Sequence, residues 1–224
     1  MELFIHNLGI ITKNFQSVFK FKIPKFFKNQ PGKYYRRNYY DSYVVKDFTE
    51  FALSISKNEK HCFEIKSEIS FGEISFGMKL NQVISLLGTP KFKLIKHYSS
   101  FDLTVLIYKD KINNNKKVSV FYFINEIFVA GEHKFSDLSK ENIGFLKRML
   151  FKKYDSEKDV EWKDFFLKNP ENAIIYYNES FYISVFYLSL TESTMNHILK
   201  EISERESQVK NKLSQKEIAL LKSL

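Results

Sequence analysis

The sequence predicts an α+β fold in which antiparallel sheet is covered on one face by helices. Segments in which apolar and polar residues alternate predict strands, and segments with apolar residues three and four positions apart predict helices. Hydrophobic residues make up 44% of the 224 residues and charged residues 27%, as in an ordinary globular protein. Only 7 glycines and 4 prolines occur, so each one that stands between two such segments marks a boundary.

The first helix of the predicted fold covers residues 42–56. Val44, Phe48 and Ile55 belong to an apolar stripe at helical spacing, and Ser42 is the candidate N-cap. Residues 61–69, "HCFEIKSEI", then alternate as in a strand.

The next stretch, "ISFGEISFGMKLNQVISLLGTPKF" at 69–92, has sharp boundaries. Gly77 indicates a turn after a strand, and a helical pattern follows in which Gln82 can reach back to the N-cap. Gly88 suits the position just beyond the helix, and Pro90 prevents the helix from continuing. Each residue here has a structural role, so the stretch is a marker of the fold.

Beyond this stretch, strands and helices alternate. The pattern predicts a polar turn at Asn125–Glu126 and a short helix around Trp162 and Phe165. In the last helix, Glu201 and Arg205 form a helix-supporting pair, and Ser214 restarts the helix. The other predicted elements are strands at 91–100 and 102–110, hairpins over 118–133 and 173–190, a helix at 139–154 and a helix from Thr191.

These elements predict three regions. Residues 1–41 form a basic aromatic N-terminal arm without regular structure, and residues 42–190 form the α+β domain. Within it, two helix-plus-hairpin repeats are expected at 70–135 and 136–190. Residues 191–224 form the C-terminal helix.

The stretch from Gly77 onward resembles the SmpA/OmlA (BamE-like) outer-membrane assembly lipoproteins and the β-lactamase-inhibitor-protein fold, in which two such units occur in tandem. The residues that match the family pattern are Gly77, Met78, Gln82, Val83, Leu87, Gly88 and Pro90. Lys79 stands where the family has a capping Ser or Thr, and no lipobox cysteine lies near the N-terminus, so membrane anchoring does not carry over. The resemblance covers residues 70–190 and implies a scaffold for protein recognition without shared catalytic residues.

The basic arm is the sharpest candidate for a binding site. Residues 1–40 contain eight Lys or Arg residues and one acidic residue, Glu2, whereas the other residues are nearly balanced in charge. Cations can neutralise phosphates, and interleaved aromatic rings can stack on bases or enter a lipid headgroup layer. The alternative is that the arm's aromatic rings belong to the core. The candidate residues are Lys20, Lys22, Lys25, Lys28, Lys33, Tyr34, Tyr35, Arg36, Arg37, Tyr39 and Tyr40.

No catalytic or metal-binding motif occurs in the sequence. The five histidines lack metal-ligand spacing, and the single cysteine, Cys62, fits a buried thiol better than a reactive one. There is no phosphate-binding loop, dinucleotide fingerprint or nucleophile elbow. We therefore expect no enzyme activity, no cofactor and no metal.

We expect a non-catalytic protein-binding module of bacterial type that presents sheet faces and loops. Its most concrete form is an immunity or inhibitor protein that blocks a toxin or enzyme. The alternative is a protein whose basic arm binds nucleic acid or an anionic membrane. The C-terminal helix could pair with a second copy through Ile198, Leu199, Ile202 and Val209. One cysteine, no secretory signal and no run of 18 apolar residues predict a cytoplasmic location.

Overall fold

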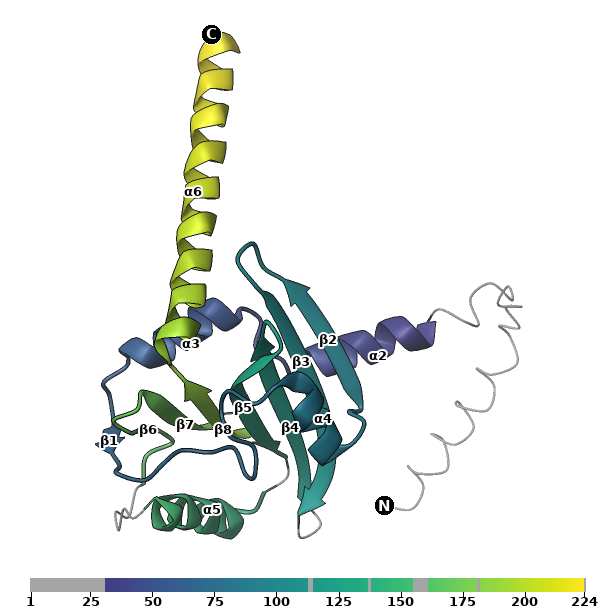
Figure 1. Ribbon diagram of the computed structural model, residues 1–224, viewed down its shortest axis with the longest axis vertical. Helices are drawn as coiled ribbons and strands as arrows, with labels where there is room; N and C mark the ends of the chain where they lie inside the picture. Colours follow the sequence, from purple (N-terminus) through teal and green to yellow (C-terminus); the bar gives the residue numbers. More distant parts are fainter. Residues whose placement is uncertain (1–30, 113–114, 137, 155–160, 181, 224) are drawn as a thin grey trace, which may run out of the picture. The chain divides into compact units, whose positions relative to one another are not determined.

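The computed structural model describes residues 31–112, 115–136, 138–154, 161–180 and 182–223. The chain divides into two compact units, Met1–Asp41 and Ser42–Leu224. The described part of the first unit is one helix, α2 (Pro31–Asp41). All other described elements belong to the second unit (Figure 1).

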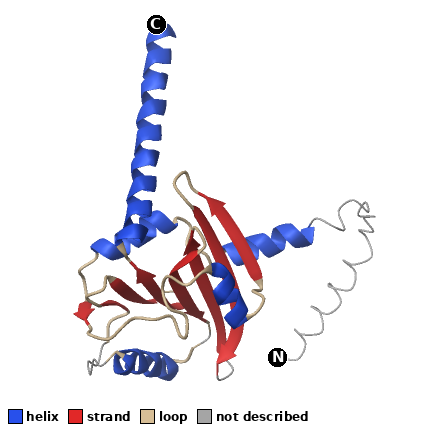
Figure 2. Cartoon of the chain, viewed as in Figure 1, coloured by secondary structure: helices blue, strands red, loops and turns tan. Residues whose placement is uncertain are grey.

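An eight-stranded sheet forms the centre of the second unit (Figure 2). Its strand order is β1-β6-β7-β8-β5-β4-β3-β2. β1 runs parallel to β6, and each of the other neighbouring pairs is antiparallel. The strands are β1 (Cys62–Glu64), β2 (Phe92–His97), β3 (Asp102–Ile112), β4 (Asn115–Ile124), β5 (Ile127–Phe135), β6 (Asp164–Lys168), β7 (Ala173–Glu179) and β8 (Ile183–Ser189).

The predicted α+β class is confirmed, but the helices divide between the two faces of the sheet. On one face lie α4 (Leu80–Leu87) and α5 (Lys140–Lys153). Their buried residues join one apolar cluster with the sheet, in which the Phe151 ring of α5 lies 4.9 Å from the Phe165 ring of β6. The segment that precedes α4 adds Phe71 to the same cluster.

The opposite face carries α3 (Phe48–Lys57) and the first part of α6 (Glu192–Ser223), which contact each other. Phe48 stacks on Tyr122 of β4 at 5.3 Å between ring centroids. Tyr122 is fully buried, and its neighbour Phe121 packs on the α4 side. Helices therefore lie on both faces of the sheet, and the expectation that a sheet face is presented to a partner stays a prediction.

The strand order places β5 beside β8. These are the last strands of the two predicted repeats, each of which begins with a helix on the same face of the sheet. The duplication itself stays a prediction.

The start of α3 differs from the sequence prediction. Asp47, and not Ser42, is the N-cap: its carboxylate accepts hydrogen bonds from the Thr49 and Glu50 amides at 3.0 and 3.2 Å. An aspartate in this position accepts hydrogen bonds from two amide groups that have no partner within the helix. The helix therefore begins six residues later than Ser42.

The boundaries of α4 and α5 follow the predictions. The Gln82 side chain accepts a hydrogen bond from the Lys79 amide at 2.9 Å, and Gly88 ends α4 with a φ of 77°. Ser139 caps α5 by accepting a bond from the Asn142 amide at 3.2 Å. The predicted turn at Asn125–Glu126 joins β4 to β5, and both of its residues have positive φ, as a tight hairpin turn requires.

Three other predictions are wrong. The segment predicted as a short helix around Phe165 is β6, whose Phe165, Phe166 and Leu167 are all buried. α6 continues through Ser214 without a restart. Residues 31–41, predicted as irregular, form α2 with Pro31 at its first position, where proline's fixed φ suits a helix.

Candidate functional site

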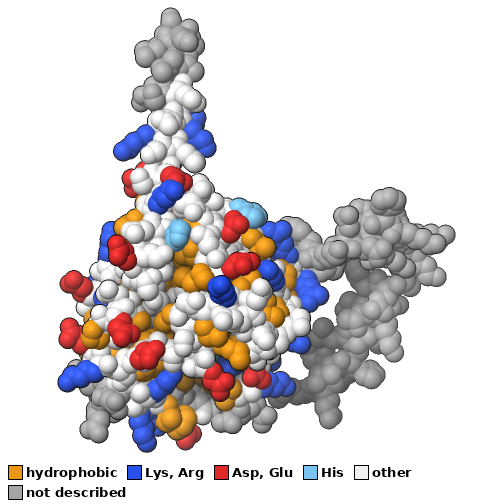
Figure 3. Space-filling view, in the orientation of Figure 1, with side chains coloured by type: hydrophobic (Ala, Val, Ile, Leu, Met, Phe, Trp, Pro, Cys, Tyr) orange, Lys and Arg blue, Asp and Glu red, His pale blue; other side chains and the backbone are white. Residues whose placement is uncertain are grey.

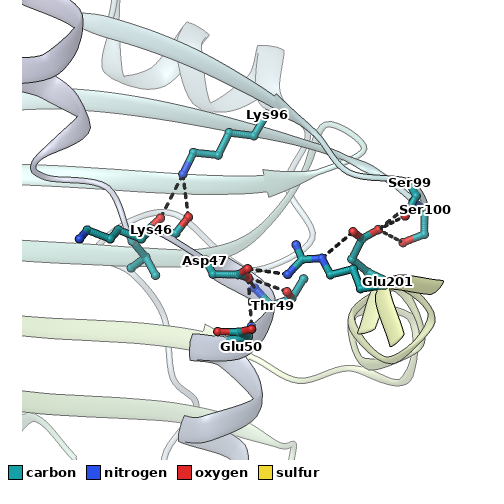
Figure 4. Close-up of polar contacts among 10 residues, drawn as sticks. Lys46, Asp47, Thr49, Glu50, Lys96, Ser99, Ser100 and Glu201 are labelled. Carbon is teal, nitrogen blue, oxygen red and sulfur yellow. Dashed lines mark hydrogen bonds and ion pairs between the residues drawn. The ribbon is translucent and has the colours of Figure 1, made fainter. Parts of the chain in front are cut away.

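A network of charged and polar side chains holds α6 against the start of α3 and the β2–β3 turn (Figure 4). Arg205 joins two carboxylates: its Nη1 lies 2.5 Å from Asp47 Oδ2, and its Nε donates to Glu201 Oε1 at 3.0 Å. The guanidinium also lies 5.2 Å from the centre of the Tyr98 ring. One side chain of α6 is thus fixed by the start of α3, by its own helix and by the turn after β2.

Glu201 extends the network to the turn between β2 and β3. Its Oε2 accepts hydrogen bonds from the Ser99 hydroxyl at 2.7 Å, the Ser100 amide at 3.1 Å and the Ser100 hydroxyl at 3.2 Å. Glu201 is buried, so these bonds replace the water that the carboxylate loses on folding. The α3 N-cap, the β2–β3 turn and α6 are therefore joined at one point.

The network keeps both carboxylates ionised. Burial raises the pKa of Asp47, but hydrogen bonds from Thr49 and Arg205 outweigh it and hold the pKa below the ordinary 3.8. Burial opposes ionisation of Glu201 in the same way, and its serine partners hold its pKa below 4.5. Because both values are lowered in the native state, this stabilisation is present at neutral pH and is lost as the pH falls below these ordinary values.

From Glu206 to Lys212, the side chains of α6 do not pack on the rest of the second unit. Every side chain from Glu206 to Lys212 is exposed, while the helix backbone continues to Ser223. Val209, which is 56% exposed, lies on the same helical face as Ile198, Ile202 and Arg205. The helical face that packs on the second unit at Ile198 therefore continues, exposed to solvent, as far as Val209.

The sequence prediction for α6 needs one correction. Ile198, proposed as part of a contact with a second copy, is fully buried within its own chain. Leu199 and Val209 are exposed, and Ile202 is half-buried.

The candidate residues of the basic arm are only partly described. Arg36, Arg37 and Tyr39 are exposed on α2, and Tyr40 is half-buried. Arg37 lies 3.9 Å from Asp41, one helical turn later. Lys33, Tyr34 and Tyr35 belong to the α2 backbone, and nothing is described of their side chains. Lys20, Lys22, Lys25 and Lys28 lie outside the described residues.

A second charged cluster lies inside the molecule, under α3. Glu132 Oε1 accepts a hydrogen bond from the Ser184 hydroxyl at 2.6 Å and lies 3.4 Å from Lys134 Nζ. Burial raises the pKa of Glu132, although Lys134 and Ser184 oppose this. Tyr122 donates weakly to the same carboxyl at 3.4 Å and accepts a bond from the Val45 amide. The cluster joins β4, β5 and β8 to the segment before α3, a structural role.

On the face shown in Figure 3, cationic and anionic side chains are interspersed among apolar ones. Within the part of the chain that the structure describes, no three His, Cys, Asp or Glu side chains gather as metal ligands would. No helix among the same residues combines the length and the apolar character needed to cross a bilayer.

Comparisons of this chain with protein-family models, with curated proteins and with solved structures found no match. The resemblance to the BamE-like and β-lactamase-inhibitor-protein folds therefore stays a prediction. The geometry of the chain's own residues must support any proposal about function.

Proposed function

We propose that this chain is a non-catalytic protein-binding module in which α6 engages the partner. The observation that carries the proposal is that α6 is fixed at its base by Arg205 and is exposed from Glu206 to Lys212. A helical segment that packs on nothing is marginally stable in water. A partner that buries the face of Val209 would supply the missing packing, as in other helix-in-groove complexes.

The most concrete form of the proposal is an inhibitor or immunity protein that blocks a bacterial toxin or another enzyme in the cytoplasm. A rigid base supports this role because a pre-oriented helix loses little conformational freedom on binding. The network at Asp47, Glu201 and Arg205 supplies such a base. A helix that binds in a groove of its partner blocks that partner by contact alone and needs no catalytic residue.

Replacing Val209 with glutamate should weaken partner binding at least tenfold, since it removes an apolar contact and buries a charge. The partner would be isolated on the tagged full-length chain from native cells, and its affinity measured by biolayer interferometry. Asn211→Glu is the matched control, because Asn211 is exposed on the opposite side of α6. Equal affinity of the two variants, or the absence of a stoichiometric partner, would count against the proposal. A purified partner whose activity the wild-type chain inhibits would identify the inhibitor form.

A second candidate function is binding to nucleic acid or to an anionic membrane. The exposure of Arg36, Arg37 and Tyr39 on α2 favours it, because cations beside an aromatic ring suit phosphate and base contacts.

Under this candidate function, the double change Arg36→Gln, Arg37→Gln should reduce the salt dependence of binding. Each lost phosphate contact lowers the slope of log K against log salt by about 0.7–0.9, so the expected loss is about 1.5. Fluorescence polarisation with single-stranded DNA and sedimentation with phosphatidylserine vesicles measure the two cases. Lys210→Gln, Lys212→Gln removes the same charge from α6 and should leave the slope unchanged. No binding of the wild-type chain at low salt would exclude this function.

A further inference from the structure

A pocket opens on the face of the sheet that carries α4. Its volume is about 410 Å³, within the range of about 300–1,000 Å³ that is usual for small-molecule sites. It lies between the turn at Phe71–Ile74, the end of α4 at Leu87, and strands β3, β4 and β5. It is separate from the network at the base of α6, because Tyr122 and Phe121 direct adjacent positions of β4 to opposite faces.

Aromatic rings supply the apolar part of this pocket. The Phe71 ring stacks on His133 at 4.2 Å and meets Phe121 edge to face at 4.9 Å. Tyr108 lies 5.4 Å from Phe121 and is held by a hydrogen bond from its hydroxyl to the Gly88 carbonyl at 2.9 Å. Fixed rings of this kind suit a ligand with a planar, apolar body.

Ser119 and His133 supply a hydrogen-bond donor beside these rings. The Ser119 Oγ lies 3.0 Å from His133 Nδ1. A serine and a neutral imidazole hold two polar hydrogens, and their mutual bond uses one of them. If serine donates, the Nε2 hydrogen is left over, and if Nδ1 donates, the hydroxyl hydrogen is left over. In either tautomer the pair can donate one hydrogen bond to a ligand.

A cation close to this pair, Lys117, favours an anionic group in the ligand. Lys117 lines the pocket, and the structure records no ion pair for it among the described residues. Asp110, directly opposite on β3, accepts a bond from the Lys111 amide at 2.7 Å. Burial lowers the pKa of His133, and Lys117 and Lys153 lower it further. The imidazole is therefore neutral, and Lys117 is the cation that acts on it most strongly, in a lining that also holds Lys109, Glu73 and Asp110.

We infer that this pocket binds a small organic anion with a planar apolar body, such as an aromatic monocarboxylate. Tyr108 and Leu87, the more exposed apolar side chains of the lining, receive the body above the buried rings of Phe71 and Phe121. The leftover donor of the Ser119–His133 pair and the ammonium group of Lys117 receive the carboxylate. This site is independent of the helix surface proposed above.

Benzoate is a suitable probe for the full-length chain, whose five histidines can be followed by NMR after selective labelling. His133→Gln identifies the His133 signals. Benzoate should shift them saturably, while benzylamine, with the same ring and the opposite charge, should not. Lys117→Gln should weaken benzoate binding about tenfold, as expected for losing one charge-assisted hydrogen bond. Lys116→Gln, a change in the exposed neighbouring residue, should leave the affinity unchanged.

Three results would overturn the inference. They are the absence of a saturable shift with benzoate, an equal shift with benzylamine, and equal affinities of the Lys116 and Lys117 variants for benzoate. The near-ultraviolet circular dichroism of each variant verifies that its aromatic core is intact.

Discussion

Replacing Gly131 with alanine should lower the free energy of unfolding by about 1–3 kcal/mol, the usual cost of inserting a methyl group into a packed core. A Cβ at this position would lie 2.6 Å from the Phe71 ring. That ring cannot retreat, because it is buried between Phe121, His133 and Tyr187. Urea denaturation of the two proteins measures the difference.

Gly144→Ala provides the matched control. Gly144 lies within α5, and an added Cβ would meet only the Arg148 side chain at 3.5 Å. Because alanine favours a helix over glycine, this change should stabilise the chain by about 0.5–1 kcal/mol. In a Phe71→Ala background, Gly131→Ala should cost much less, since the clash is gone. A Gly131→Ala protein as stable as the wild type would show that Phe71 does not pack on this strand as described.

Replacing Lys134 with methionine should be the most damaging of the charge changes. It leaves the Glu132 carboxylate buried without a cation, which costs about 3–5 kcal/mol when one partner of a buried pair is removed. The side chains of the two residues are 15% and 6% exposed, so water screens the pair little. Urea denaturation at pH 7 measures the loss.

The cost of Lys134→Met should also depend on pH, in a direction that follows from the pKa of Glu132. The native pKa of Glu132 is already raised above 4.5 by burial, and the loss of Lys134 raises it further. A raised native pKa means that ionisation opposes folding as the pH climbs above 4.5. The cost of Lys134→Met should therefore be smaller at pH 5 than at pH 7. In a Glu132→Gln background, the cost of Lys134→Met should fall below about 1 kcal/mol. A cost of about 3–5 kcal/mol in that background would show that the loss does not come from the unpaired Glu132 carboxylate.

Local sequence patterns predicted most of the fold because each reflects an interaction between residues that are close together in the sequence. Ser139 and Gln82 act on amides within one helical turn, and the turn at Asn125–Glu126 needs only two residues with positive φ. β6 was missed because it lies between β1 and β7, so its consecutive apolar residues are buried on both faces and show no alternation. An apolar stripe also cannot specify which face of a sheet its helix covers, so the division of α3 and α4 between faces was not predictable.

The candidate site was less accessible to sequence reasoning. The pair of Glu201 and Arg205 follows from helical spacing, and the structure confirms it at 3.0 Å. Asp47, which is 158 residues from Arg205, and the serines of the β2–β3 turn are joined to it only by the tertiary fold. The pocket at His133 has the same origin, because cross-strand pairing brings Ser119 beside His133.

The central claim is that α6 beyond Arg205 is a surface for another protein. Site-specific photo-crosslinking in native cells tests it most directly, with a benzophenone side chain placed at position 209 or, as control, at position 211. The proposal predicts one adduct of defined mass from position 209 and little or none from position 211. No adduct at position 209, or an adduct with the mass of two copies of this chain, would contradict it.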